Sequence, residues 1–89
     1  MTTIKGYRDL KLQDIEAISR IKELGAEIED RINKTTHIVR EMRSVAPLTE
    51  GEQLRLDEAQ PERWIAIART HFQEGLMALT RAIAQPSNF

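Results

Sequence analysis

The sequence has no cysteine, few aromatic residues and no long apolar run. Without cysteine, disulfide scaffolds, thiolate zinc sites and cysteine nucleophiles are all excluded. No stretch approaches the roughly 20 apolar residues that a membrane-spanning helix needs. We also expect no signal peptide before the first polar residues. The lack of a membrane span and of a signal peptide leads us to expect a cytoplasmic protein without a membrane partner, whereas the lack of cysteine says nothing about the compartment.

The chain also lacks an excess of charge of either sign. Thirteen Lys and Arg residues stand against 14 Asp and Glu residues, which gives a net charge of −1. A general binder of DNA or RNA polymers would show a strong basic excess, so we do not expect one here. The length of 89 residues predicts a single domain over residues 1–89,. Chains of this size bury only about 60% of their unfolded surface, which favours self-association.

The first long apolar pattern predicts a helix over residues 12–43, preceded by an arm over residues 1–11. Asp14 lies near its start, where an acidic side chain suits the positive end of a helix. Apolar or small residues follow at alternating steps of 3 and 4, the seam pattern of a coiled coil: Ile18, Ile21, Gly25, Ile28, Ile32, Thr35, Val39 and Met42,.

Residues 44–60 interrupt this pattern and form the predicted connection. Pro47 prevents a smooth continuation of the helix. Residues 49–52 (TEGE) have the spacing of a capping box, which favours a weak helical turn over residues 53–59,. Pro61 fits the first turn of a second helix, where its missing N–H costs nothing.

A second apolar pattern predicts a helix over residues 61–85. Its seam takes the same steps along the chain, through Ile65, Ala68, Phe72, Gly75, Leu79 and Ala82. Two long helices joined by such a connection predict an all-α fold, an antiparallel two-helix hairpin with a short N-terminal arm.

The second helix is apolar well beyond its predicted seam, which indicates a homo-oligomer. One partner helix covers only a narrow stripe, so the rest would form an exposed patch typical of an interface. Gly25 and Gly75 point the same way, because each costs about 1 kcal/mol relative to Ala in a helix. We expect a close backbone approach by another helix or by a bound molecule at both glycines.

Enzyme and metal signatures are weak. His37 and Glu41 are one helical turn apart, but two ligands without a third do not make a metal site, and an exposed pair explains them better. His71 is interpreted as a packed histidine rather than a general base. No catalytic triad, phosphate loop or HExxH motif is present. We expect no enzyme, no metal and no cofactor.

Two cations border the predicted seams. Lys22 and Arg69 both fall at heptad position e, where the ordinary role is an interhelical salt bridge. Tyr7 gives Lys22 another possible task, since it lies in an irregular arm that can fold across a neighbouring helix. An aromatic ring and a cation together are the minimum needed to hold a nucleotide.

Five stretches of the chain resemble the small phage hairpin proteins that counter bacterial CBASS immunity. They are residues 6–10 (GYRDL), 21–25 (IKELG), 63–70 (RWIAIART), 73–79 (QEGLMAL) and 81–82 (RA). The resemblance covers the arm and both predicted helices, but not residues 44–60. It departs from the family pattern in the longer connection, in Leu76 where an aromatic is expected, and in Thr80 where an asparagine is expected.

The resemblance implies a sponge that sequesters cyclic oligonucleotide messengers without cleaving them, in the cytoplasm of the infected host. It implies a homohexamer with cyclic dinucleotides such as cyclic GMP-AMP between protomers, and cyclic trinucleotides at a separate site. Carried over, Tyr7 stacks on a base and Lys22 pairs with a phosphate, with Arg8 a lesser candidate. Arg69 and Thr70 are the candidates for the second site.

Two other functions remain open at this stage. A structural coiled coil or adaptor explains the heptads and the oligomer, but leaves Tyr7 and Lys22 without a task. Residues 14–21 (DIEAISRI) also look like the first helix of the helical chorismate mutases. Those enzymes use a third substantial helix, whereas residues 44–60 have room for a short one only.

Overall fold

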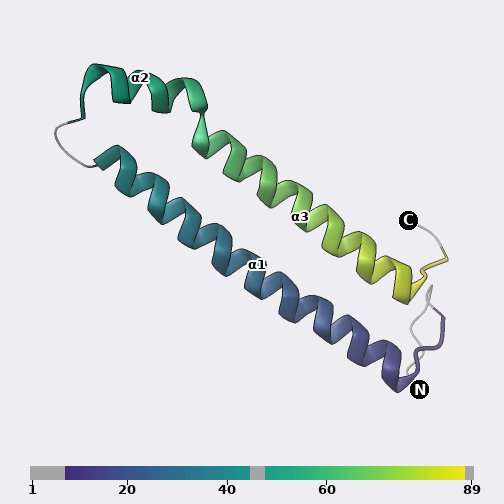
Figure 1. Ribbon diagram of the computed structural model, residues 1–89. Coiled ribbons are helices and arrows are strands. Elements are labelled where there is room, and N and C mark those ends of the chain that lie inside the picture. The colour runs from purple at the N-terminus through teal and green to yellow at the C-terminus, as the bar shows by residue number, and fades with distance from the viewer. Residues whose placement is uncertain (1–7, 45–47, 88–89) are drawn as a thin grey trace.

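The computed structural model describes residues 8–44 and 48–87. They form three helices, α1 (Leu12–Ser44), α2 (Glu50–Ala59) and α3 (Pro61–Ala84). The two long helices α1 and α3 lie side by side and run in opposite directions, while α2 lies at the end far from the start of α1 (Figure 1). The molecule is a rod of 61 × 22 × 14 Å. The predicted antiparallel hairpin is confirmed.

Helix α1 begins at the predicted residue because a side chain of its own first turn caps its start. The carboxylate of Asp14 accepts a hydrogen bond of 2.9 Å from the backbone N–H of Lys11. The backbone of Asp14 in turn donates to the Lys11 carbonyl at 3.0 Å. This reciprocal pairing satisfies amides that a helix start otherwise leaves unpaired. At its other end α1 runs one residue beyond the predicted boundary, to Ser44.

The connection contains a longer helix than the weak turn over residues 53–59 that the sequence predicts. Its helix α2 spans the ten residues Glu50–Ala59 and is capped by Thr49, whose hydroxyl accepts from the Glu52 amide at 3.1 Å. The predicted capping role of Thr49 is therefore confirmed. At the other end Gln60 follows the helix, adopts a left-handed conformation and donates to the Leu56 carbonyl at 3.0 Å.

Contacts beyond α2 explain its extra length. Leu56 is only 3% exposed, the lowest value among the buried hydrophobic residues. Arg43 at the end of α1 donates to Asp57 at 3.0 Å and forms a two-pronged ion pair with Glu62 of α3. This guanidinium lowers the pKa of the Glu62 carboxyl, and the two carboxylates raise the pKa of Arg43. One side chain thus ties all three helices together.

Helix α3 starts at Pro61, in the first-turn position that the sequence predicts. It ends one residue before the predicted boundary, because Gln85 takes a left-handed conformation and donates to the Arg81 carbonyl at 2.8 Å. This is the closing pattern that ends many helices.

The predicted seam of α3 is wrong beyond Phe72. Gly75, Leu79 and Ala82 are exposed, whereas the less exposed residues of this half are Leu76, Thr80, Ile83 and Ala84. The cause is the period of a straight helix, about 3.6 residues per turn, against the 3.5 of a supercoiled heptad. The covered stripe that starts at Ile65 therefore drifts away from the heptad positions.

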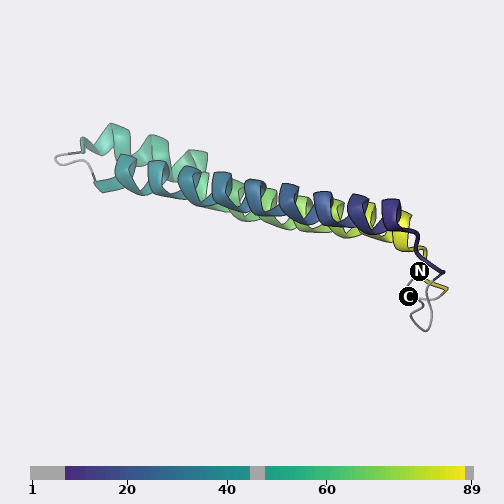
Figure 2. The ribbon, with the colours of Figure 1, turned by 90° about the horizontal axis from the view of Figure 1, so that it is seen from below.

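The single chain buries little apolar surface. Its buried hydrophobic residues in the described ranges are Leu10, Ile32, Val39, Leu56 and Ala84. Figure 2 shows why: α1 and α3 form one flat layer, which leaves both faces open along most of the rod. None of the described helices combines the length and apolarity that a bilayer-spanning segment requires.

Candidate functional site

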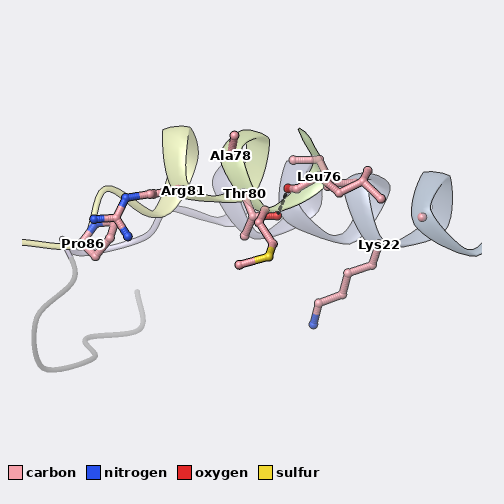
Figure 3. A pocket seen from close by; sticks show the side chains of 9 residues that line it. Lys22, Leu76, Ala78, Thr80, Arg81 and Pro86 are labelled. Carbon is pink, nitrogen blue, oxygen red and sulfur yellow. Dashed lines mark hydrogen bonds between the residues drawn. The ribbon is translucent and has the colours of Figure 1, made fainter. Parts of the chain in front are cut away.

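A pocket of about 430 Å³ lies in the groove between α1 and α3, near the end where α1 starts. Figure 3 shows Lys22 at one end of it and Arg81 and Pro86 at the other. The hydroxyl of Thr80 donates to the Leu76 carbonyl at 3.0 Å on the α3 side. The complete lining is Ile21, Lys22, Gly25, Leu76, Met77, Ala78, Thr80, Arg81 and Pro86.

A second pocket of about 390 Å³ lies in the same groove, farther along α1. It shares three residues with the first pocket, namely Lys22, Gly25 and Leu76. Arg69 and Phe72 of α3 join its wall. The structure thus gathers Lys22, Arg69 and an aromatic ring around one cavity.

The boundary between the two pockets is formed by Leu76 against Gly25. A Cβ atom added to Gly25 would lie 3.3 Å from Cδ1 of Leu76. That separation is tighter than ordinary van der Waals contact, so glycine allows Leu76 to settle into the groove. The group that approaches Gly25 is thus a side chain of the other helix, and not the backbone that the sequence leads us to expect. A Cβ atom added to Gly75 would meet no group of another described element within 4 Å, so the approach predicted there is not made within a single chain.

Lys22 has the placement expected of an anion-binding residue. Its side chain is exposed and lies against both pockets, whose other walls are largely apolar. Within residues 8–44 and 48–87 no acidic group forms an ion pair with it. A cation beside an apolar wall suits a ligand that carries both a phosphate and a base.

Arg69 and Thr70, although adjacent in sequence, lie in different pockets. Arg69 lies in the groove and donates to the Asn33 side chain at 3.3 Å, with Glu29 4.0 Å away. Thr70 lines a pocket of about 300 Å³ with Arg63, Ala66, Ile67 and His71. Its hydroxyl donates to the Ala66 carbonyl at 3.2 Å.

The side chain of Arg8 forms hydrogen bonds with other residues of the same chain. Its guanidinium donates to the Ile83 carbonyl and to the Asp14 carboxylate, both at 3.0 Å. Together with the neighbouring backbone amide of Lys11, this guanidinium holds the pKa of Asp14 below its usual value. Tyr7 lies outside the described residues, so the position of its ring relative to Lys22 stays a prediction.

The structure adds residues to the site that the sequence pattern did not single out. Arg81 contributes a second cation to the first pocket, and Phe72 contributes a ring to the second. Phe72 already lies on the predicted seam of α3, whereas no apolar period of the sequence marks Arg81. On the opposite side Arg63 stacks over the Trp64 ring, 5.3 Å from its centroid.

Metal chemistry finds no support in the described ranges. There, no three side chains of His, Asp or Glu gather in a way that would hold an ion. His37 and Glu41 form an exposed pair at 3.0 Å within one helical turn. The predicted reading of these two residues as an exposed helical pair is confirmed.

Comparisons with known proteins agree with this architecture. The family model of the Acb2/Tad1 hairpin domain matches residues 2–84. The chain is also 38% identical to Anti-CBASS protein 2 of Pseudomonas phage JBD67, over an alignment of 98 residues that covers 93% of this chain and 91% of that protein. The family match spans both long helices and the groove between them, and the chain therefore belongs to the Acb2/Tad1 hairpin-domain family.

Proposed function

We propose that this chain binds and sequesters cyclic oligonucleotide messengers without cleaving them, and so blocks CBASS signalling in the cytoplasm of an infected bacterium. The observation that carries the proposal is the match over nearly the whole chain to a phage protein named for its action against CBASS. The ligands proposed are cyclic dinucleotides such as cyclic GMP-AMP, and cyclic trinucleotides.

The groove between α1 and α3 supports a dinucleotide site. We propose that Lys22 pairs with a phosphate at the point where the two pockets meet, and that a base stacks on Tyr7. A charge-assisted hydrogen bond contributes about 1.5–3 kcal/mol, so a few of them account for tight capture. The apolar part of the groove offers surface to the base and sugar.

A homo-oligomer completes the proposal. Leu79, Met77 and Phe72 of α3 are large apolar residues that the single chain leaves exposed. A second copy of this chain is the partner that covers them, and the family resemblance gives a hexamer as the expected size. In such an assembly two copies present equivalent groups to the two halves of one cyclic ligand.

For a second ligand class we propose Arg69 and Thr70, as the resemblance implies. Because these residues line different pockets, one ligand contacts both of them only if it lies around α3 or between copies. The variants R69A and T70V, titrated with a cyclic trinucleotide and with cyclic GMP-AMP, test this. Loss of the trinucleotide alone supports a second site. Equal loss of both ligands contradicts it, because Lys22 and Arg69 would then serve one site.

Calorimetric titration with cyclic GMP-AMP tests the central proposal. We expect tight binding by the wild type, strong loss in K22A and Y7A, and no loss in the control K34A. Lys34 is a suitable control because it lies on the same helix, paired with Asp30 at 2.8 Å on an exposed surface. Binding that survives in K22A would remove Lys22 from the site.

Two further measurements separate this function from its alternatives. Chromatography of the released ligand should recover it intact, whereas a processed product would indicate an enzyme. A coiled-coil adaptor would show no rise in melting temperature with any cyclic di- or trinucleotide. A ligand that binds only the native state must raise it by mass action.

A further inference from the structure

We propose that Arg8 and Asp14 are positioning residues that hold the arm in place for ligand capture. We use the term clasp for the Arg8 guanidinium, the Asp14 carboxylate and the Ile83 carbonyl. The inference rests on the proposed function, and it gives Arg8 a task different from direct contact with the ligand.

The geometry of the clasp uses the forked shape of a guanidinium. Nε of Arg8 donates to the Ile83 carbonyl at 3.0 Å, and Nη1 donates to Oδ2 of Asp14 at 3.0 Å. The side chains of Arg8 and Asp14 are 34% and 17% exposed, so the pair is partly shielded from water. A lysine has one ammonium and cannot reproduce two bonds in these fixed directions.

The clasp joins two helix ends of opposite character. Ile83 lies in the last turn of α3, where carbonyls lack a helical partner and the helix dipole is negative,. Asp14 lies in the first turn of α1 and also accepts the Lys11 amide at 2.9 Å. Arg8 is a cation between a negative helix end and a carboxylate, which explains why a charged side chain lies there.

This arrangement fixes the chain next to the proposed stacking residue. Tyr7 precedes Arg8 directly, and consecutive Cα atoms are about 3.8 Å apart, so a fixed Arg8 restricts where Tyr7 can lie. Two residues after Arg8 in the sequence, Leu10 is buried. Arg81 and Pro86, which flank Ile83 in sequence, line the first pocket. The clasp therefore anchors residues 8–11 at the end of that pocket.

The expected consequence is a preorganised arm. If the clasp opens, the backbone beside Tyr7 gains freedom that ligand binding must remove again. Fixing roughly one residue of backbone corresponds to about a tenfold change in affinity. The variants D14N and R8K should each weaken binding of cyclic GMP-AMP by about tenfold while the hairpin stays folded.

A second arginine–carboxylate pair provides the matched control. Arg43 and Glu62 form a comparable pair at the opposite end of the rod. The variant E62Q should lower the melting temperature as D14N does, but leave the affinity for cyclic GMP-AMP unchanged. Hydrogen exchange of residues 8–11 should accelerate in D14N and not in E62Q. A purely structural role for Asp14 would lower melting temperature in both variants and affinity in neither.

Calorimetry with wild type, R8K, D14N and E62Q decides between the possible outcomes. The clasp is supported if R8K and D14N, but not E62Q, bind cyclic GMP-AMP more weakly and if the amides of residues 8–11 exchange faster. Unchanged affinity in D14N overturns it. If R8K then still binds weakly, Arg8 contacts the ligand directly. Absence of binding by the wild type would instead refute the proposed function, and the clasp as a positioning device with it.

Discussion

At the scale of single residues, Gly25 sets the shape of the groove. Its missing side chain lets Leu76 of α3 approach closely, and this contact forms the boundary between the two pockets beside Lys22. The resemblance described for the sequence also leads us to expect an aromatic residue in place of Leu76. The pair Gly25–Leu76 is therefore where we expect ligand choice to be adjusted.

The variant G25A should change binding more than stability. Alanine favours the helix by about 1 kcal/mol, which offsets part of the crowding against the end of a flexible leucine side chain. We expect a melting temperature close to that of the wild type, together with weaker binding of cyclic GMP-AMP, because Leu76 must move into a pocket. The double variant G25A/L76A removes the clash and should regain affinity. Wild-type affinity in G25A would show that the boundary has no influence on the ligand.

Glu62 provides a prediction on pH dependence. Its pKa lies below the usual 4.5 because of the Arg43 guanidinium. A carboxylate with a lowered pKa in the folded state stabilises the protein above its unfolded pKa, and this contribution disappears as the pH falls through the folded value. The free energy of unfolding should therefore differ most between wild type and E62Q near neutral pH. The difference should shrink below pH 4.5.

Urea unfolding at a series of pH values measures this difference. Asp14 and Asp30 also have lowered pKa values and contribute to acid unfolding in both proteins, so only the difference between wild type and E62Q isolates Glu62. The variant D30N should show a smaller difference of the same sign, because the pair of Asp30 with Lys34 is exposed and lies within a single helix,. A wild-type advantage over E62Q that stays constant into the acid range would contradict the role given to Arg43.

At the scale of elements, α2 depends on one leucine. Leu56 is almost completely buried, whereas Leu54 two residues earlier is 59% exposed. A buried Leu→Ala change costs about 2–5 kcal/mol. The variant L56A should therefore release α2, while α1 and α3 stay paired through their own extensive contact.

Hydrogen exchange resolves this local effect. The amides of α2 should exchange much faster in L56A, and those in the middle of α1 should keep their wild-type rates. The matched variant L54A changes an exposed leucine on the same helix and should alter exchange little. Equal acceleration along α1 and α2 in L56A would mean that the hairpin and the connection unfold as one unit.

The same elements show how far sequence reasoning reaches. The ends of α1 and α3 were predicted within one residue, because local signals such as Asp14 and Pro61 set them. The full length of α2 was missed, since it depends on Leu56 and Arg43, which act across the fold. The covered face of α3 was misassigned beyond Phe72 because a heptad was assumed for a nearly straight helix.

For the site, sequence reasoning located single residues but not their grouping. Heptad position e predicts that Lys22 borders the partner helix, and the structure places Lys22 against the groove between α1 and α3. The meeting of Lys22 with Arg69, and of Arg8 with Ile83, depends on how the second helix folds back onto the first. Positions 8 and 83 are 75 residues apart, and no local pattern encodes such a contact.

At the scale of the whole molecule, the single chain buries too little apolar surface for us to expect that it acts alone. Five hydrophobic residues of the described ranges are buried, while large ones such as Met77 remain 70% exposed. Small domains of this kind usually gain their remaining stability from association or from a ligand. The proposed oligomer and the proposed ligand site therefore depend on the same open faces.

The outward face of α3 gives the sharpest test of association. Leu79 is 50% exposed, and like Gly75 it lies on the face of α3 that is turned away from α1. If a second copy packs there, the variant L79K places a charge in an apolar interface and should yield a single chain in light scattering, with its helix content intact. The control L54K alters a leucine of α2 that is 59% exposed and should keep the oligomer. An L79K protein of wild-type mass would show that the copies meet elsewhere. A wild type that is itself a single chain would rule out a ligand site shared between protomers.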